Sequence, residues 1–236
     1  MTLQQLLGIE IPILQAPMAG VQESALAVAV SEAGGLGALP CAMLSPEALR
    51  SELAAIRSQT RRPFNVNFFC HTPPVPNAER EARWRSALTP YYREFGLDPG
   101  AAAGAGRAPF SAEAAGVLAE FEPPVVSFHF GLPAAELLAR VRRWGAQVLS
   151  SATTVEEAVW LESQGVDAVI AQGLEAGGHR GHFLSDDLTS QIGTFALVPQ
   201  LVQAVKVPVI AAGGIADAAG VAAAMRLGAA GAQVGT

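Results

Sequence analysis

The sequence predicts an α/β fold, a (β/α)8 TIM barrel, from three observations. Short β-branched runs alternate with Ala- and Leu-rich stretches along the 236 residues, a pattern typical of a parallel sheet covered by helices. Eight such runs can be drawn, which is the number that closes this barrel. The composition, 50% hydrophobic and only 15% charged, suits a sheet that is buried on both faces.

The expected strands are Ile13–Ala16, Leu36–Leu39, Asn65–Phe69, Val125–His129, Gln147–Ser150, Ala168–Ala171, Val209–Ala212 and Ala232–Val234. The helices expected between them are Ser24–Ala33, Pro46–Arg57, Pro133–Trp144, Val155–Gln164, Phe195–Val205 and Ala218–Leu227. Ser45 is a good cap for the second helix, and Gly34 a natural end for the first. Most strand-to-strand periods run about 20 to 30 residues, as crossover units do.

Two connections are longer than one helix requires. Residues 71–124 hold a polar helix candidate, Asn77–Tyr92, and we interpret them as an insertion over the barrel mouth; an extra helix on the wall is the alternative. Residues 172–193 form a Gly-rich polar loop after the sixth strand. Loops of this length in compact domains are usually functional or disordered.

The chain stops at Thr236, directly after the eighth strand. A complete barrel would carry an eighth helix there. We therefore expect one domain, residues 1–236, that ends after strand eight without the last helix or a C-terminal extension.

Composition also excludes several classes of protein. The net charge of −6 offers no electrostatic footprint for nucleic acid. No run reaches the roughly 18 apolar residues of a membrane span, and the start of the chain does not resemble a signal peptide. Cys41 and Cys70 are too few for a disulfide framework or a cysteine zinc site. We expect a cytoplasmic protein with neither a nucleic-acid nor a membrane partner.

Candidate site residues follow from the rule that such barrels work at the C-terminal ends of their strands. Gly213-Gly214 and Gly235-Thr236 follow strands seven and eight, the usual phosphate site, where backbone N–H groups can bind a dianion. Tight turns alone are the alternative reading. Lys206, the only lysine, precedes strand seven at the opposite face, which disfavours Schiff-base and pyridoxal chemistry.

Histidines and amides occupy other strand ends. His179 lies in a flexible glycine loop over the mouth, where an imidazole suits proton abstraction or charge stabilisation. His182 is close in sequence, but no third ligand accompanies the pair, so we expect no metal site. His129 ends strand four, where it has either a structural, hydrogen-bonded role or a contact with the substrate. Asn67 and Gln172 either donate to a planar heterocycle or are satisfied barrel amides, and His71 is interpreted as a solvated loop residue.

These residues, in this order, resemble nitronate monooxygenases of the class I group, formerly called 2-nitropropane dioxygenases. The resemblance covers essentially the whole chain. It rests on Gln15–Gly20, the Asn67 strand, Ser127–Pro133, the highly specific loop Gln172–Gly181 and the two glycine loops.

The resemblance implies FMN and the oxidation of alkyl nitronates, such as propionate 3-nitronate, by O2 to a carbonyl compound and nitrite. His179 matches the catalytic histidine, and His129 is placed at the substrate. The positions matching the flavin-binding segments are Pro17, Met18, Ala19, Asn67, Gln172, Gly177, Gly213, Gly214, Gln233, Val234, Gly235 and Thr236.

Other functions remain open at this point. An FMN-dependent enoyl reductase or NAD(P)H:quinone reductase could use the same barrel. A phosphate-binding isomerase or lyase would need no flavin, and a truncated barrel could be inactive. A homo-oligomer is also left open, because an uncovered apolar flank favours association.

Overall fold

The computed structural model describes residues 1–98, 100 and 107–235. The chain divides into two compact units. The larger comprises Met1–His71 and Ala108–Thr236, and the smaller comprises Thr72–Arg107. Each unit is described by itself.

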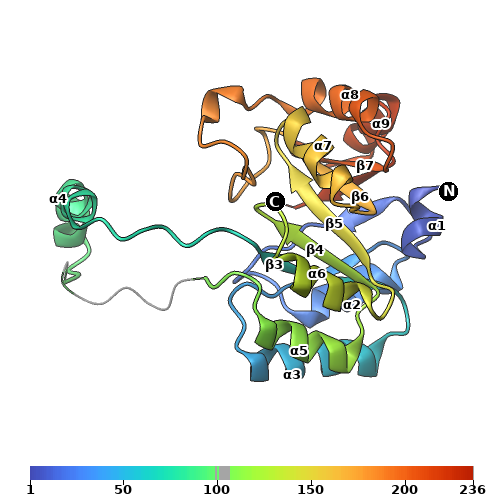
Figure 1. Ribbon diagram of the computed structural model, residues 1–236, viewed down its shortest axis with the longest axis horizontal. Coiled ribbons are helices and arrows are strands. Elements are labelled where there is room, and N and C mark those ends of the chain that lie inside the picture. The colour runs from blue at the N-terminus through green and yellow to red at the C-terminus, as the bar shows by residue number, and fades with distance from the viewer. Residues whose placement is uncertain (99, 101–106, 236) are drawn as a thin grey trace. The chain divides into compact units, whose positions relative to one another are not determined.

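The larger unit is the predicted barrel, which confirms the fold class (Figure 1). Its eight strands are all parallel and follow the order β1-β8-β7-β6-β5-β4-β3-β2. Their bounds are β1 Ile13–Gln15, β2 Gly37–Pro40, β3 Phe64–Phe69, β4 Val125–His129, β5 Gln147–Ala152, β6 Ala168–Gln172, β7 Val209–Ala212 and β8 Gly231–Val234.

The seam between β1 and β2 closes the barrel in an unusual way. One backbone bridge joins Leu14 to Leu36. Beyond it, the Gln15 side chain takes the place of a peptide group: its Nε2 donates to the Ala38 carbonyl and its Oε1 accepts from the Ala38 N–H, both at 3.1 Å. A buried side-chain amide therefore continues the ladder that the backbone begins.

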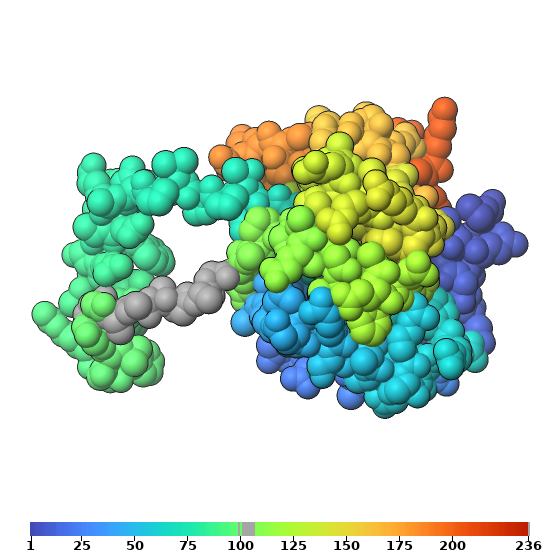
Figure 2. Space-filling view, turned by 60° about the horizontal axis from the view of Figure 1, so that its bottom comes forward, coloured from blue at the N-terminus to red at the C-terminus, as the bar shows by residue number. Residues whose placement is uncertain are grey.

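Helices connect the strands. Their bounds are α1 Leu3–Leu7, α2 Ser24–Glu32, α3 Pro46–Gln59, α5 Ala112–Phe121, α6 Ala135–Arg142, α7 Val155–Ser163, α8 Thr194–Ala204 and α9 Ala218–Arg226, with a 3-10 turn at Leu188–Ser190. All six helices expected between the strands are present. We did not anticipate α1, α5 or the 3-10 turn. Figure 2 shows α3 (blue) and α5 (green) in the outer layer, and the two helices pack against one another.

Two apolar cores lie on the two faces of the sheet. The larger lies between strands and helices and includes Leu53, Phe64 and Leu197. The smaller includes Leu14 and Ile210 from the strands, together with Leu3 and Leu7 of α1. Because α1 precedes β1 and joins this second core, it covers the N-terminal end of the barrel. The C-terminal ends of the strands are left for a site.

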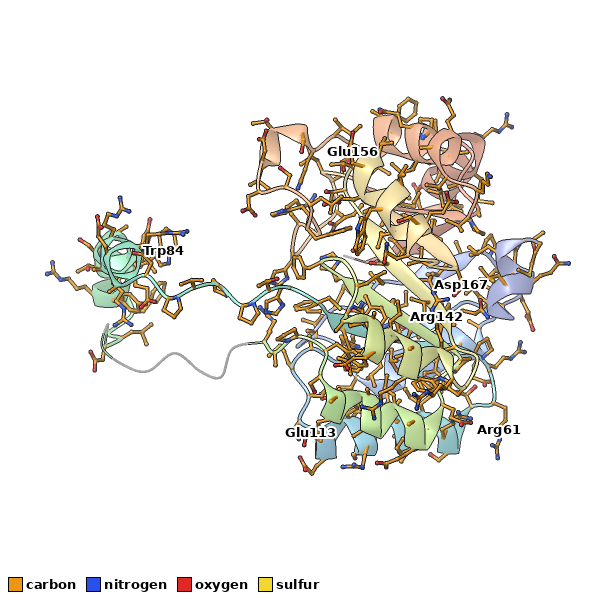
Figure 3. All side chains as sticks on the ribbon, in the orientation of Figure 1. Arg61, Trp84, Glu113, Arg142, Glu156 and Asp167 are labelled. Carbon is orange, nitrogen blue, oxygen red and sulfur yellow. The ribbon has the colours of Figure 1, made fainter. Side chains whose placement is uncertain are left out.

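The smaller unit contains α4, Ala78–Glu94, capped by the Asn77 side chain. This helix has no buried residue, and Trp84 on it is labelled in Figure 3. Among the described residues, no helix is long and apolar enough to cross a membrane.

Candidate active site

Two asparagines of β3 meet one serine of β4 inside the barrel. The register pairs Asn67 with Ser127. Asn67 Nδ2 donates to Ser127 Oγ at 2.9 Å, and Asn65 Nδ2 donates to the same oxygen at 2.8 Å. The Asn67 amide nitrogen is thus satisfied within the barrel, and the side chain is fixed at the strand end.

His129, at the end of β4, bridges β5 and the loop that follows β6. Its Nδ1 lies 2.5 Å from Ser151 Oγ, and its Nε2 lies 3.3 Å from the carbonyl oxygen of His179. A carbonyl can only accept, so Nε2 carries the hydrogen and Nδ1 accepts from the serine hydroxyl. Burial lowers the pKa of His129 to about 4. The ring is therefore neutral near pH 7.

The rings of two phenylalanines pack against those of three histidines at this end of the barrel. Phe69 has ring centroids of His71, His129 and His179 at 6.2, 5.8 and 5.4 Å. Phe130 has the same three at 6.0, 4.5 and 5.9 Å. The prediction of a solvated His71 is wrong: the ring is half-buried and its buried Nδ1 has no partner among the described residues.

The backbone at Phe130 is strained. Phe130 has φ +67° and Gly131 has φ +85°, and the left-handed region is costly for a side chain such as phenylalanine. The Ser150 hydroxyl lies 2.9 Å from the Gly131 carbonyl and 3.2 Å from that of Phe128, which fixes the turn. Strain of this kind persists where the structure holds it, commonly at functional sites.

The Gln172 side chain anchors the loop that carries His179. Its Nε2 donates to the His179 carbonyl at 2.8 Å, and its Oε1 accepts from the Gly181 N–H at 2.6 Å. A Cβ on Gly181 would lie 2.5 Å from His129 Cε1, so glycine is needed for this close passage. The loop that carries His179 is therefore anchored by side-chain hydrogen bonds, and is not the flexible glycine loop expected from the sequence.

Further contacts bind the loop along its length. Arg180 donates to the carbonyls of Gly173 and Ala176. Glu157 of α7 accepts from the N–H groups of Phe183 and Leu184, at 2.7 and 3.3 Å. The His179 side chain itself is exposed. The loop therefore presents an imidazole from a backbone that is held on both sides of it.

The glycine pair after β7 lies beneath the start of the same loop. Gly213 has φ +121°, and a Cβ there would lie 2.7 Å from Thr194 Oγ1 and 2.8 Å from the Ala176 nitrogen. Gly214 has φ +69°, with Glu175 Cβ 3.2 Å from its Cβ position. Burial raises the pKa of Glu175, but hydrogen bonds from the Thr194 N–H and hydroxyl outweigh it and leave that pKa below its ordinary value.

The strand ends next to this pair offer unused backbone donors. Within the described part of the chain, the N–H groups of Gly213, Gly214 and Gly235 donate to no protein acceptor. Gly235 adjoins the segment after β1, since its Cβ position is 3.2 Å from Ala16 Cβ and 3.7 Å from Met18 Sδ. A dianion such as a phosphate group fits donors of this type.

The remaining predicted positions lie after β1, in β8, in the His179 loop and at Thr236. Pro17, Met18 and Ala19 are half-buried after β1. Gln233 and Val234 pair with Leu14 and Gln15 across the β1–β8 ladder. Gly177 is exposed in the His179 loop, and Thr236 lies outside the described residues. Across residues 1–98, 100 and 107–235, no cluster of three or more His, Cys, Asp or Glu side chains could hold a metal ion.

Several site residues were not anticipated from the sequence: Phe69, Phe130, Ser127, Ser151, Glu157, Glu175 and Thr194. Period-two alternation along β3 and β4 could have placed Ser127 on the same face as Asn67. The left-handed turn at Phe130 and the long-range bonds of Glu157 leave no local pattern to detect.

Comparisons with known proteins agree on one family. The nitronate monooxygenase model matches residues 1–236. A nitronate monooxygenase of Paraburkholderia phytofirmans is 48% identical over 233 residues, which are 98% of this chain and 64% of that protein. One from Pseudomonas aeruginosa is 45% identical over 234 residues, 98% of this chain and 67% of that protein.

Two solved structures share the fold. Nitroalkane oxidase from Streptomyces ansochromogenes has a TM-score of 0.86 at 40% identity, covering 99% of this chain and 66% of its own. FabK from Thermotoga maritima has a TM-score of 0.73 at 33% identity, covering 100% of this chain and 61% of its own. The chain thus spans about two thirds of the length of the curated relatives it matches. On the family model and these identities, the chain belongs to the nitronate monooxygenase family.

Proposed function

We propose that this chain is the FMN-binding barrel, residues 1–236 with an insertion at about 71–124, of an enzyme that oxidises alkyl nitronates with O2. The products would be a carbonyl compound and nitrite, and a compound like propionate 3-nitronate is the expected substrate. One observation carries the proposal furthest: a single anchored loop brings His179 to the mouth and covers the glycine pair whose N–H groups are unused.

The residues at the mouth suit FMN. The backbone donors of Gly213, Gly214 and Gly235, with Thr236 beyond the described residues, would hold its phosphate. Around the rest of the cofactor we place Pro17, Met18, Ala19, Asn67, Gln172, Gly177, Gln233 and Val234. Bound FMN supplies the electron-transfer chemistry that no side chain here can supply.

His179 would act on the substrate's charge. A nitronate is already an anion and requires no base, so an imidazole beside it serves to stabilise that charge. A neutral nitroalkane would instead require His179 to remove a proton. His129 is neutral and bonded to the His179 carbonyl. We place it beside the substrate, where it fixes this part of the loop.

The test compares His179→Ala with His182→Ala, a matched change three residues along the same loop. His182 bonds locally, its Nδ1 lying 2.9 Å from the Ser185 carbonyl. We expect His179→Ala to retain FMN and to lose about 100-fold or more in kcat with ethylnitronate, and His182→Ala to retain both. Oxygen consumption and nitrite release measure turnover, and flavin absorbance measures binding.

Three results would contradict the proposal. Turnover by His179→Ala at the wild-type rate would remove the assigned role of this histidine. Rapid bleaching of bound flavin by NAD(P)H, without nitronate oxidation, would favour an enoyl or quinone reductase on the same barrel. A chain that takes up no FMN would favour a flavin-free phosphate-binding enzyme or an inactive barrel. Size-exclusion chromatography of the same preparation would show whether a homo-oligomer forms.

A further inference from the structure

Glu157 is a buried carboxylate at the site end of α7. It is 1% exposed and occupies the first turn of the helix, which begins after the cap Thr154. A negative charge is favourable there, because the helix dipole is positive at its N-terminus. Figure 3 labels its neighbour Glu156 at this end of α7, with Asp167 at the opposite end, where β6 begins.

The two oxygens of Glu157 have separate tasks. Oε2 accepts from the N–H and hydroxyl of Thr153, at 2.7 and 2.8 Å, and stays within its own turn. Oε1 accepts from the N–H groups of Phe183 and Leu184, at 2.7 and 3.3 Å. One carboxylate therefore ties the start of α7 to the far end of the loop after β6.

The segment that Glu157 holds is short and already joined to the site. Phe183 lies four residues after His179, and its ring packs against Trp160 with centroids 5.2 Å apart. The Phe183 ring also fills the space beside Gly131, with Cδ2 3.1 Å from that glycine's Cβ position. Closer to the histidine, Gln172 holds the His179 carbonyl and the Gly181 N–H. Glu157 is the second fixed point of the loop.

We propose that Glu157 is a positioning residue for His179, acting through the N–H groups of Phe183 and Leu184. The inference rests on the proposed role of His179. Without this acceptor, two backbone donors would lose their partner, and the loop beyond Gly181 would lose its tie to α7. Catalytic groups displaced by about 1 Å can lose a large part of their rate.

Two substitutions separate reach from charge. Glu157→Asp keeps the charge but shortens the side chain by one C–C bond, about 1.5 Å, which withdraws it from Phe183 and Leu184. Glu157→Gln loses the charge but keeps the length. With its carbonyl oxygen toward the loop it still accepts from Phe183 and Leu184, while its NH2 group replaces the oxygen that accepts from Thr153. We expect the length of the side chain, and not its charge, to determine the position of the loop.

Glu162 provides the matched control. It lies on the same helix and also accepts from two consecutive N–H groups, those of Lys206 and Val207, at 2.5 and 3.1 Å. These groups precede β7, at the opposite end of the barrel from His179. Glu162→Asp therefore imposes the same chemical change without touching the loop.

The experiment measures kcat with ethylnitronate in the FMN-loaded chain, and backbone hydrogen exchange of residues 173–184 by mass spectrometry. We expect Glu157→Asp to lower kcat about tenfold or more and to speed exchange in this loop while β5 stays protected. Glu157→Gln should restore most of both. Glu162→Asp should leave kcat and the loop unchanged.

A double variant distinguishes positioning from a general loss of stability. If Glu157 acts through His179, then Glu157→Asp should cost nothing further in kcat once His179→Ala is present. The inference would be overturned if the two substitutions reduced kcat by the product of their separate effects, or if Glu157→Asp left hydrogen exchange in the loop unchanged. It would also be overturned if Glu157→Gln had a lower kcat than Glu157→Asp. Should His179→Ala turn over normally, the proposed function fails, and loop exchange alone still decides whether Glu157 holds the loop.

Discussion

Acid should destabilise this barrel through His129, by an amount that follows from its pKa. Burial holds that pKa at about 4 in the folded protein, against about 6.5 in an unfolded chain. As pH falls below 6.5, the unfolded state binds the proton first, so stability falls until pH 4 and then changes no further through this group. A difference of about 2.5 pKa units corresponds to about 3 kcal/mol.

The geometry explains why the folded state resists this proton. The Nε2 hydrogen already points to the His179 carbonyl, so protonation must occur at Nδ1, 2.5 Å from the Ser151 hydroxyl that donates to it. That hydroxyl would have to reverse, in a site that solvates a cation poorly. Urea unfolding between pH 4 and 8 measures the loss of stability.

Comparison with His129→Gln isolates this histidine from the carboxylates that titrate in the same range. A glutamine can retain both hydrogen bonds, as a donor to the His179 carbonyl and as an acceptor from Ser151, but binds no proton. We expect its stability to fall by about 3 kcal/mol less than that of the wild type from pH 7 to pH 4. Parallel pH profiles for the two proteins would refute the reasoning.

Two further predictions concern the crowding around Gly213 and the closure of the barrel. Gly213→Ala should abolish FMN binding and lower the free energy of unfolding by about 3 kcal/mol or more, because its Cβ would meet Thr194 and Ala176. The control is Gly145→Ala, where the glycine is also left-handed but lies in open space; it should lower the free energy of unfolding by about 1 kcal/mol and keep FMN, and equal effects of the two substitutions would contradict the crowding argument. Gln15→Leu should cost about 2–3 kcal/mol by leaving the buried Ala38 N–H without an acceptor, lowering Tm by about 5–10 °C; an unchanged Tm in a thermal scan would show that the seam does not depend on this side chain.

The sequence predicts the barrel well because its signals are local and repeated. Most of the strands are short runs rich in apolar residues, bounded by turn residues that are visible in the local sequence. The helix Ala112–Phe121 is not among the predicted helices, although Ser111 caps it and Ala115, Val117 and Leu118 are buried. The short helix Leu3–Leu7 is not among them either, despite a capping box between Thr2 and Gln5.

The site was harder to predict because its order depends on partners far apart in the chain. The positions of Asn67, His129 and Gln172 at strand ends follow from strand bounds alone. Their hydrogen bonds do not: Asn67 bonds Ser127, 60 residues away, and His129 meets the carbonyl of His179, 50 residues away. The prediction for His71 is wrong for the same reason, since its ring packs against Phe130 from a distant part of the chain.

The pairing of β1 with β8 constrains how the protein can be made. Residues Ile13–Gln15 find their ladder partners only at Ala232–Val234, and on their other side they meet β2 through one bridge and a glutamine side chain. On the ribosome, the first strand must therefore wait, with one edge unpaired, until residues 232–234 have been made. Exposed strand edges promote association between chains, so a chaperone that shields the unpaired edge of β1 would act during this interval.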